Sequence, residues 1–302
     1  MENGKNNENG KLSKGLGIHA RRILAYVVLA IFTFLCLVWF VVLFINSTRS
    51  NGQLTAGFTL VPGGHFLDNL KNTVLGDDRR DFFVALWNSK IFTCLRNSFI
   101  ISICCVVLSI YFSAMTAYAI HAYQFKLRKA AFTFILAIMT IPTQVSVLGF
   151  IKLITNMGMD DTFWPLIIPS ICSPVTFFYI KQYMDSTLPL SLVEAARIDG
   201  AGEFKIFNTI VLPLMKPAMA VQAIFCFVGC WNNYFTPALV ISSSNKKTLP
   251  IFIAEMRNAD YQHFDMGKVY MSITFSILPI IIIYIILSKH IIGDMTTGGV
   301  KE

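Results

Sequence analysis

The fold is decided by the stretch Glu194-Ala195-Ala196-Arg197-Ile198-Asp199-Gly200, which lies between two long apolar runs. The pattern Ser191-x-x-Glu194 predicts a capping box, in which the serine hydroxyl and the glutamate side chain satisfy free backbone donors. The two alanines favour a helix and leave a flat surface. Asp199-Gly200 indicates the end of that helix, because glycine tolerates left-handed backbone. We therefore expect a short capped helix.

A second short helix is expected to follow directly. Phe204, Phe207 and Val211 recur at a spacing that places them on one helix face. Pro213 would end this helix, because proline has no amide donor and restricts the residue before it. An ordinary polar loop between two membrane spans could carry the same local signals, so the pattern alone leaves that alternative open.

The composition is that of an integral membrane protein. Hydrophobic residues make up 55% of the 302 residues, charged residues only 14%, and the mean hydropathy is +0.60. Soluble domains typically carry about 25% charged residues. The net charge is +8, but the basic residues lie in the connections between apolar runs. Orientation in a membrane explains them better than a nucleic-acid partner, and we expect no nucleic acid.

The seven cysteines predict neither a disulfide framework nor a zinc site. Nearly all of them lie inside apolar runs, and no C-x-x-C pattern or Cys/His cluster is present. Small buried hydrophobic side chains are the simpler interpretation. We predict no metal site and no cofactor.

Six apolar runs predict six transmembrane helices and hence an all-α polytopic membrane protein. A helix needs about 20 apolar residues to cross a bilayer. The runs are 23–45, 97–120, 130–153, 162–183, 216–240 and 266–287. Pro142 interrupts the third run, and the fourth contains Pro165, Pro169 and Pro174. The first run is longer than the apolar core of a signal peptide, about 7–15 residues, so we interpret it as a retained helix.

Six crossings place both termini on one side of the membrane, and the positive charge of short loops predicts which side that is. The N-terminal tail, the connection after the second run and the connection after the fourth run are the basic ones. Their cations are Lys5, Lys11, Lys14, Arg21, Arg22, Lys126, Arg128, Lys129, Lys181, Arg197, Lys205 and Lys216. This bias, although modest, predicts that both termini and the stretch 190–213 are cytoplasmic.

The whole spacing from Glu194 to Pro213 resembles the EAA motif of membrane permeases in binding-protein-dependent ABC importers. Glu194, Ala195, Ala196, Gly200, Ile210, Leu212 and Pro213 match that motif in register. The resemblance runs from about Arg96 to the C-terminus and is best to carbohydrate-type permeases similar to the G subunit of the maltose transporter.

Three further patterns carry the resemblance to that subfamily. Trp231-Asn232-Asn233-Tyr234 resembles its W-N-x-[FY] pattern, Thr248-Leu249-Pro250 matches T-L-P, and residues 293–301 resemble its G-x-T-x-G-A-V-K ending. The ending here has one extra residue, and Gly299 stands where alanine is usual. Gly202 stands where many relatives carry Ser or Thr, which are better helix caps.

The resemblance implies the type I ABC importer (MetI-like) permease fold in a bacterial-type plasma membrane. The composition of residues 1–20, rich in Asn, Gly and Lys, predicts a disordered cytoplasmic tail. A first transmembrane helix with an extracytoplasmic loop is expected at 21–93. The resemblance implies a five-helix permease core (94–288) with a cytoplasmic coupling loop (184–213), followed by a cytoplasmic C-terminal tail (289–302). It also implies three kinds of partner: a second homologous permease, two cytoplasmic ATPase subunits and an extracytoplasmic solute-binding protein.

The resemblance makes six residues of the first short helix the ATPase-coupling residues. They are Glu194, Ala195, Ala196, Arg197, Asp199 and Gly200. The flat alanine surface would dock in a cleft of the ATPase, with Glu194 and Arg197 free to form ion pairs at its rim. The protein would then be a transport subunit of the sugar or oligosaccharide class in its family, and not itself an enzyme.

ATP hydrolysis is expected from a separate chain, because the sequence has neither a Walker A pattern nor G-x-G-x-x-G. An ion-gradient-driven secondary transporter is the alternative. Such proteins usually show internal repeats and a charged residue at mid-membrane, and neither is evident here. An ABC permease for a non-sugar solute is a further alternative, disfavoured by the C-terminal ending and by Trp231-Asn232.

Four intramembrane polar residues are candidates for the translocation pathway: Gln144, Asn232, Asn233 and Tyr234. Amide and aromatic groups would suit a sugar, because they hydrogen-bond hydroxyl groups and stack on the ring. The structural alternative, helix–helix hydrogen bonding by the amides, is the commoner use of such residues in membranes. The sequence does not identify the substrate.

Overall fold

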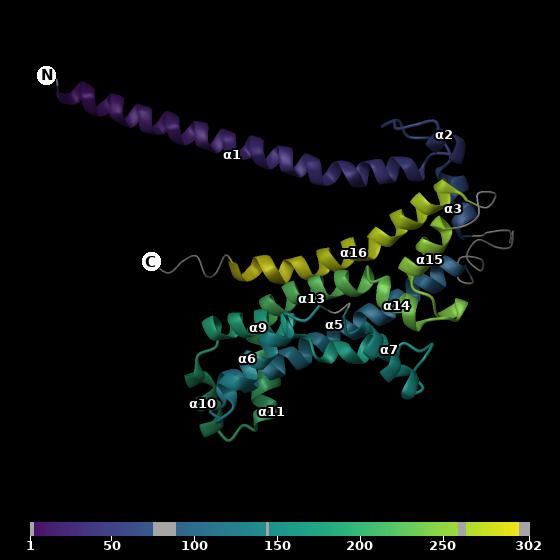
Figure 1. Ribbon diagram of the computed structural model, residues 1–302. Helices are drawn as coiled ribbons and strands as arrows, with labels where there is room; N and C mark the ends of the chain where they lie inside the picture. The colour runs from purple at the N-terminus through teal and green to yellow at the C-terminus, as the bar shows by residue number, and fades with distance from the viewer. Residues whose placement is uncertain (1–2, 75–88, 143–144, 259–263, 296–302) are drawn as a thin grey trace. The chain divides into compact units, whose positions relative to one another are not determined.

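The computed structural model describes residues 3–74, 89–142, 145–258 and 264–295, and every regular element within these ranges is a helix (Figure 1). The chain divides into two compact units. The first comprises Met1–Leu70 with Asp265–Thr274, and the second comprises Lys71–Phe264 with Phe275–Glu302. The predicted all-α fold is thus confirmed for the described residues.

The first unit is built on α1 (Asn3–Ser47) and α2 (Asn51–Thr55). Beyond the end of α1, the buried Arg49 donates to the carbonyl of Gly57 at 3.0 Å. The amide of Asn69 donates to the carbonyls of Ser47 at 2.8 Å and Arg49 at 2.9 Å. Asn69 lies on α3 (Phe66–Val74), and these bonds satisfy backbone carbonyls that the end of a helix leaves free.

The boundaries of the terminal helices differ from those expected. Helix α1 begins at Asn3, within the segment 1–20 for which composition predicts a disordered tail. Helix α16 (Met266–Met295) continues past Leu287 into the segment 289–302 that was expected to be a tail. The division of the chain into a permease core and two tails remains a prediction.

The second unit is organised around α5 (Lys90–Ala122), which packs against α9 (Pro174–Thr187) and α13 (Lys216–Trp231) (Figure 1). Small buried side chains line the central helix and let its neighbours approach closely. They include Ser102, Ser109, Ser113, Ala114 and Ala117. The largest core cluster joins these three helices to the segment 193–215.

Three of the six predicted spans are broken into shorter helices. The third consists of α6 (Arg128–Ile138) and α7 (Val147–Asn156), on either side of Pro142. The fourth consists of α8 (Trp164–Ile167), a 3-10 turn (Ile168–Ile171) and α9. Pro165, Pro169 and Pro174 each lie in the first turn of one of these pieces, where a missing amide donor costs least.

The fifth predicted span, 216–240, begins at a sharp bend and is broken once within its bounds. The segment Glu203–Leu214 meets α13 at an angle of 79°. Helix α13 then ends at Trp231, and α14 (Phe235–Val240) follows a short break. Within the described ranges, three continuous helices are long and apolar enough to cross a membrane: Arg21–Ser47, Lys90–Ala122 and Met266–Lys289.

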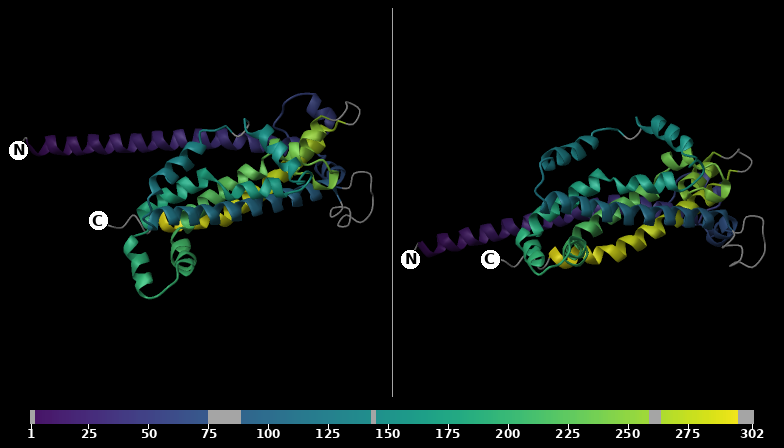
Figure 2. Two further views of the ribbon diagram at one scale, coloured as in Figure 1. Left: turned by 60° about the horizontal axis from the view of Figure 1, so that its bottom comes forward. Right: turned by 90° about the horizontal axis from the view of Figure 1, so that it is seen from below.

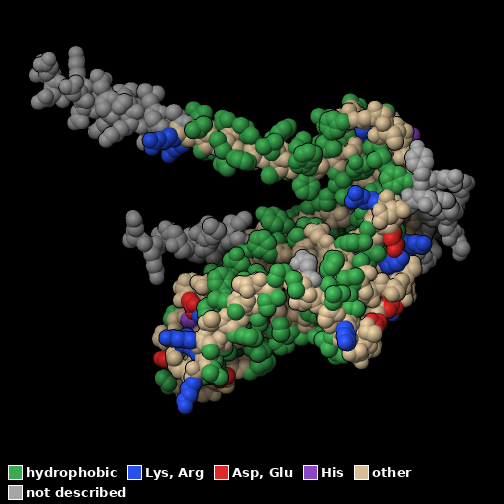
Figure 3. Space-filling view, in the orientation of Figure 1, with side chains coloured by type: hydrophobic (Ala, Val, Ile, Leu, Met, Phe, Trp, Pro, Cys, Tyr) green, Lys and Arg blue, Asp and Glu red, His purple; other side chains and the backbone are tan. Residues whose placement is uncertain are grey.

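Two ends of the second unit carry its charged side chains, whereas hydrophobic side chains cover much of the flank between them (Figure 3). Such a large exposed apolar surface is expected of a protein whose solvent is lipid. One of these ends bears α10 (Leu190–Ile198) and α11 (Glu203–Ile206). The other bears a 3-10 turn (Ser244–Lys246) and α15 (Leu249–Arg257).

Candidate functional site: a helical hairpin and an outer cavity

Helix α10 ends in a complete Schellman motif. The amide of Gly200 donates to the carbonyl of Arg197, and the amide of Ala201 donates to that of Ala196, both at 3.0 Å. Gly200 has φ +78°, which is left-handed backbone. The helix stop predicted at Asp199-Gly200 is therefore confirmed.

The predicted capping box at the start of α10 is wrong. The helix begins two residues earlier than that box implies, at Leu190, and Pro189 occupies the cap position without a side-chain hydrogen bond. Ser191 consequently lies inside the first turn. Because Pro189 has extended backbone (φ −67°, ψ 133°) and cannot continue a helix backwards, it sets the boundary that the serine was expected to set.

The second helix of the hairpin contains a π-helical turn. Helix α11 runs into a π turn (Phe207–Val211) and then into α12 (Leu212–Leu214), so Pro213 does not end the helix as predicted. The extra residue of a π turn also shifts the helix face. Phe207 and Val211 are buried as expected, but Phe204 is 71% exposed, and Ile206 is buried in its place.

The hairpin is fixed to the ends of α5 and α9 by its buried side chains. Val193, Ala196, Ile206, Phe207 and Val211 belong to the same core cluster as the buried residues of those helices. Figure 2 shows α10 and α11 projecting together from the end of the long helices. A rigid attachment of this kind lets a force on the hairpin move the helices with it.

An ion pair inside the hairpin joins its two helices. Arg197 Nε donates to Glu203 Oε1 at 2.6 Å, and the guanidinium lies over the ring of Tyr123, 5.3 Å from its centroid. Tyr118 donates to the other oxygen of Glu203 at 2.8 Å. The hydrogen bond from Arg197 lowers the pKa of Glu203 to about 2. Arg197 is therefore engaged within the chain rather than free to form an ion pair with a partner.

The outward face of the hairpin carries large exposed apolar side chains beside charged ones. Ile198 is 86% exposed and Phe204 71%, and Ala195 and Glu194 are exposed as well. Asp199 and Gly200 are also exposed. Of the six predicted coupling residues, four thus lie on the surface, whereas Ala196 is buried and Arg197 is half-buried.

A second ionic network, which the sequence analysis missed, supports the base of the hairpin. His121 Nδ1 lies 2.7 Å from Asp185 Oδ1, and its Nε2 lies 3.0 Å from the carbonyl oxygen of Leu188. Lys181 donates to Asp185 Oδ2 at 2.6 Å. Burial raises the pKa of Asp185, but the hydrogen bonds from Lys181 and His121 outweigh it and lower the pKa overall. The i, i+4 spacing of Lys181 and Asp185 was the available signal.

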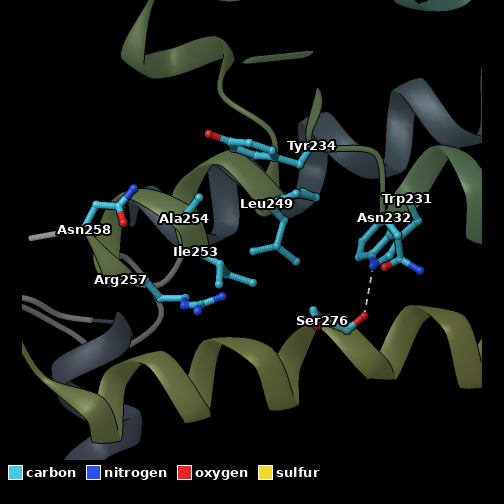
Figure 4. Close-up of a pocket in the computed structure, with 10 residues that line it drawn as sticks. Trp231, Asn232, Tyr234, Leu249, Ile253, Ala254, Arg257, Asn258 and Ser276 are labelled. Atoms are coloured by element: carbon cyan, nitrogen blue, oxygen red, sulfur yellow. Dashed lines mark hydrogen bonds between the residues drawn. The ribbon is translucent and has the colours of Figure 1, made fainter. Parts of the chain in front are cut away.

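The opposite end of the second unit contains a cavity of about 500 Å³ between α13, α15 and α16 (Figure 4). Two predicted pathway residues, Asn232 and Tyr234, line it together with Arg257 and Asn258. Trp231 forms its inner wall: the indole Nε1 donates to the carbonyl of Ser276 at 3.0 Å, and the ring stacks on Phe227. Asn232 and Tyr234 themselves are exposed.

The other two predicted pathway residues are not in this cavity. Asn233 is half-buried, and its Oδ1 accepts from the amide of Thr236 at 3.3 Å, so it stabilises the break between α13 and α14. Gln144 lies outside the described residues. In the second unit, the amide of Asn97 on α5 joins two elements: it donates to the carbonyls of Asn245 and Lys247 at 2.9 and 3.1 Å.

Asp161 anchors the loop beside this cavity. Its Oδ1 accepts from the amides of Ser242 and Ser243 at 2.9 Å, and Lys246 Nζ lies 3.0 Å from its Oδ2. The hydrogen bond from the Ser243 hydroxyl, together with these contacts, holds the pKa of Asp161 well below its usual range. Among the residues that the structure describes, no group of three His, Cys, Asp or Glu side chains could hold a metal ion.

A family model, the binding-protein-dependent transport system inner membrane component, matches residues 109–296. The arabinooligosaccharides transport system permease protein AraQ of Bacillus subtilis (strain 168) is 37% identical over 73% of this chain and 78% of its own length. The sn-glycerol-3-phosphate transport system permease protein UgpE of Brucella abortus (strain 2308) is 30% identical over 83% of this chain and 88% of its own.

Solved structures share the fold. A chain of a bacterial ABC transporter involved in the import of the acidic polysaccharide alginate superposes with a TM-score of 0.74 at 24% identity, covering 88% of this chain and 95% of that one. A chain of the alginate transporter in complex with alginate pentasaccharide-bound periplasmic protein gives a TM-score of 0.52 at 16% identity, covering 88% and 92%.

The family model covers well over half of the chain, including the hairpin, the core helices and the outer cavity. The relatives match over most of their own lengths. This chain therefore belongs to the binding-protein-dependent transport system inner membrane components, the permease subunits of ABC importers.

Proposed function

We propose that this chain is one of two permease subunits of an ATP-driven importer. Two cytoplasmic ATPase subunits would hydrolyse ATP, and an extracytoplasmic binding protein would deliver the solute. The observation that carries the proposal is the exposed hairpin of α10 and α11, which is attached to α5 and α9 by a continuous core. Membership of a binding-protein-dependent family supports the same set of partners.

The hairpin is proposed to be the ATPase-docking element, with Glu194, Ala195, Ile198 and Asp199 on its outward face. Exposed apolar side chains are costly in water and favour burial against a partner. Arg197 acts differently from the expectation: it holds α10 against α11 and the end of α5. The hairpin then moves as one body, which is what force transmission requires.

The proposed orientation places the hairpin and both termini in the cytoplasm, and the outer cavity on the opposite side of the plasma membrane. The distribution of basic residues supports it, because cytoplasmic loops carry an excess of Lys and Arg. The same orientation brings the outer cavity and the loop at Asp161 to the side from which a binding protein would approach.

ATP dependence is the most direct test of the proposed class. Uptake of the solute should disappear when the cognate ATPase is deleted, because the sequence has no Walker A pattern and the energy would have to come from that partner. Radiolabelled uptake in the deletion strain, with and without an uncoupler of the proton gradient, provides the measurement. Continued uptake that the uncoupler abolishes would contradict the proposal and favour a secondary transporter.

An oligosaccharide is the proposed solute. AraQ is named for arabinooligosaccharides, and the aromatic and amide groups of the outer cavity suit a sugar ring and its hydroxyls. UgpE is named for sn-glycerol-3-phosphate, so a non-sugar solute is the second candidate. Asn232 and Tyr234 are proposed to contact the solute, whereas Asn233 has a structural role.

Variants of the cavity test this assignment. Asn232→Leu and Tyr234→Ala should each raise the KM of uptake several-fold, because a lost hydrogen bond or stacking contact is worth roughly 1 kcal/mol. Phe235→Leu is the matched control, since Phe235 is also exposed but does not line the cavity. An unchanged KM in both cavity variants, measured at equal membrane levels, would rule out direct contact with the solute.

A further inference from the structure

A second cavity lies beside the hairpin end of the second unit, at the turn between α5 and α6. Its volume is about 660 Å³. Three cations line it, and apolar and neutral side chains form the remaining wall. The lining residues are Ile120, Gln124, Phe125, Lys126, Arg128, Lys129, Phe132 and Thr133.

The positive charge of this cavity is not neutralised within the described chain. Lys126, Arg128 and Lys129 take part in none of the ion pairs found among the described residues of the chain. The carboxylate of Asp185, near the C-terminal end of α9, already contacts Lys181 and His121. Arg128 donates one bond to the carbonyl of His121 at 3.3 Å, which ties the cavity to that network.

The cavity combines these cations with an apolar wall. Phe125 and Phe132 contribute aromatic rings, and Phe132 packs edge-on against Phe177 of α9. Large apolar side chains beside the cavity are exposed: Leu127, in the turn before α6, is 69% exposed, and Phe134, on α6, is 65% exposed. Such a combination is found where a protein surface passes from hydrocarbon to headgroups. A soluble phosphate compound would gain nothing from the apolar part.

We propose that this cavity binds the phosphate headgroup of an anionic phospholipid, with the acyl chains along the exposed apolar side of α6. Lys126 and Lys129 are both exposed and supply the charge that selects an anionic lipid over a zwitterionic one. The assignment of this lipid to the cytoplasmic leaflet rests on the proposed function, whereas the binding itself does not.

The test is lipid retention by the full-length chain. The purified protein in detergent is titrated with phosphatidylglycerol or phosphatidylcholine, and bound lipid is counted by native mass spectrometry. We expect preferential retention of phosphatidylglycerol, and an affinity for it that is about thirtyfold weaker in the Lys126→Gln/Lys129→Gln variant. The double variant Lys205→Gln/Lys216→Gln is the matched control. Both lysines are exposed and lie near the hairpin end of the second unit, and the two substitutions lower the net charge by the same amount.

Two results would overturn the proposal. One is the same loss of phosphatidylglycerol in both double variants, which would indicate only a general effect of charge. The other is displacement of the lipid by soluble glycerol phosphate at millimolar concentration, which would indicate a site for a soluble phosphate compound. Neither result depends on ATP or on uptake, so failure here is distinguishable from failure of the proposed transport function.

Discussion

Gly200→Val is expected to reduce uptake about tenfold or more while the protein still reaches the membrane. Gly200 has φ +78°, and a Cβ there would meet no atom within 4 Å. The cost is therefore backbone strain rather than a clash. Left-handed backbone costs a non-glycine residue roughly 1–2 kcal/mol, and more when the side chain is β-branched. The strain would be relieved by opening the Schellman motif, which repositions α10 relative to α11.

Two matched variants separate this explanation from a general effect of bulk in the loop. Gly200→Asn should retain most of the uptake, because asparagine tolerates left-handed backbone. Gly202→Ser should retain all of it, because Gly202 has φ −69° in the N-cap position of α11, where serine is a better cap. Uptake measured at equal membrane levels decides the matter, and full activity of Gly200→Val would contradict a coupling role for the motif.

The sequence predicted the parts of the hairpin that depend on local backbone chemistry. Gly200 ends α10 because a left-handed residue is needed there, and this requirement is visible in the Asp199-Gly200 pair. The prolines of the third and fourth spans mark real breaks because proline has no amide donor for the helix. Two local predictions were wrong. Pro189 rather than Ser191 occupies the N-cap position of α10. A π turn shifts the helix face, so Phe204 does not lie on the buried side with Phe207 and Val211.

The long-range polar contacts of the site could not be predicted from the sequence. Arg197 meets Tyr123, and Glu203 meets Tyr118, across separations of more than seventy residues that only the packing of α5 against the hairpin brings together. His121 and Asp185, 64 residues apart, are likewise brought together only by the packing of α5 against α9. The sequence could propose the polar residues of the fifth span for the pathway, but it could not distinguish their roles. The helix break after Trp231 leaves Asn232 and Tyr234 lining the cavity, whereas Asn233 stabilises the break itself.

The second large effect is expected at Ile198. Its side chain is 86% exposed, against 71% for Phe204 and 40% for Leu190 and Leu192, so it is the apolar side chain of the hairpin best placed to fill a pocket of a partner. Burying a residue of this size is worth roughly 1.5–3 kcal/mol, equivalent to about a tenfold to hundredfold change in affinity. Ile198→Asp should therefore abolish copurification of the ATPase and uptake together, without affecting membrane insertion.

Cysteine cross-linking at this position tests the central claim most directly. Ile198→Cys is introduced after the exposed Cys36 and Cys172 are replaced by serine, and a short bifunctional maleimide is applied to membranes. Lys152→Cys is the control, because Lys152 is exposed near the opposite end of the second unit, on α7. We predict an adduct of Ile198→Cys with the ATPase subunit, identified by mass spectrometry, and none from Lys152→Cys. Labelling of Ile198→Cys in intact cells by an impermeant maleimide, with no ATPase adduct, would contradict the account.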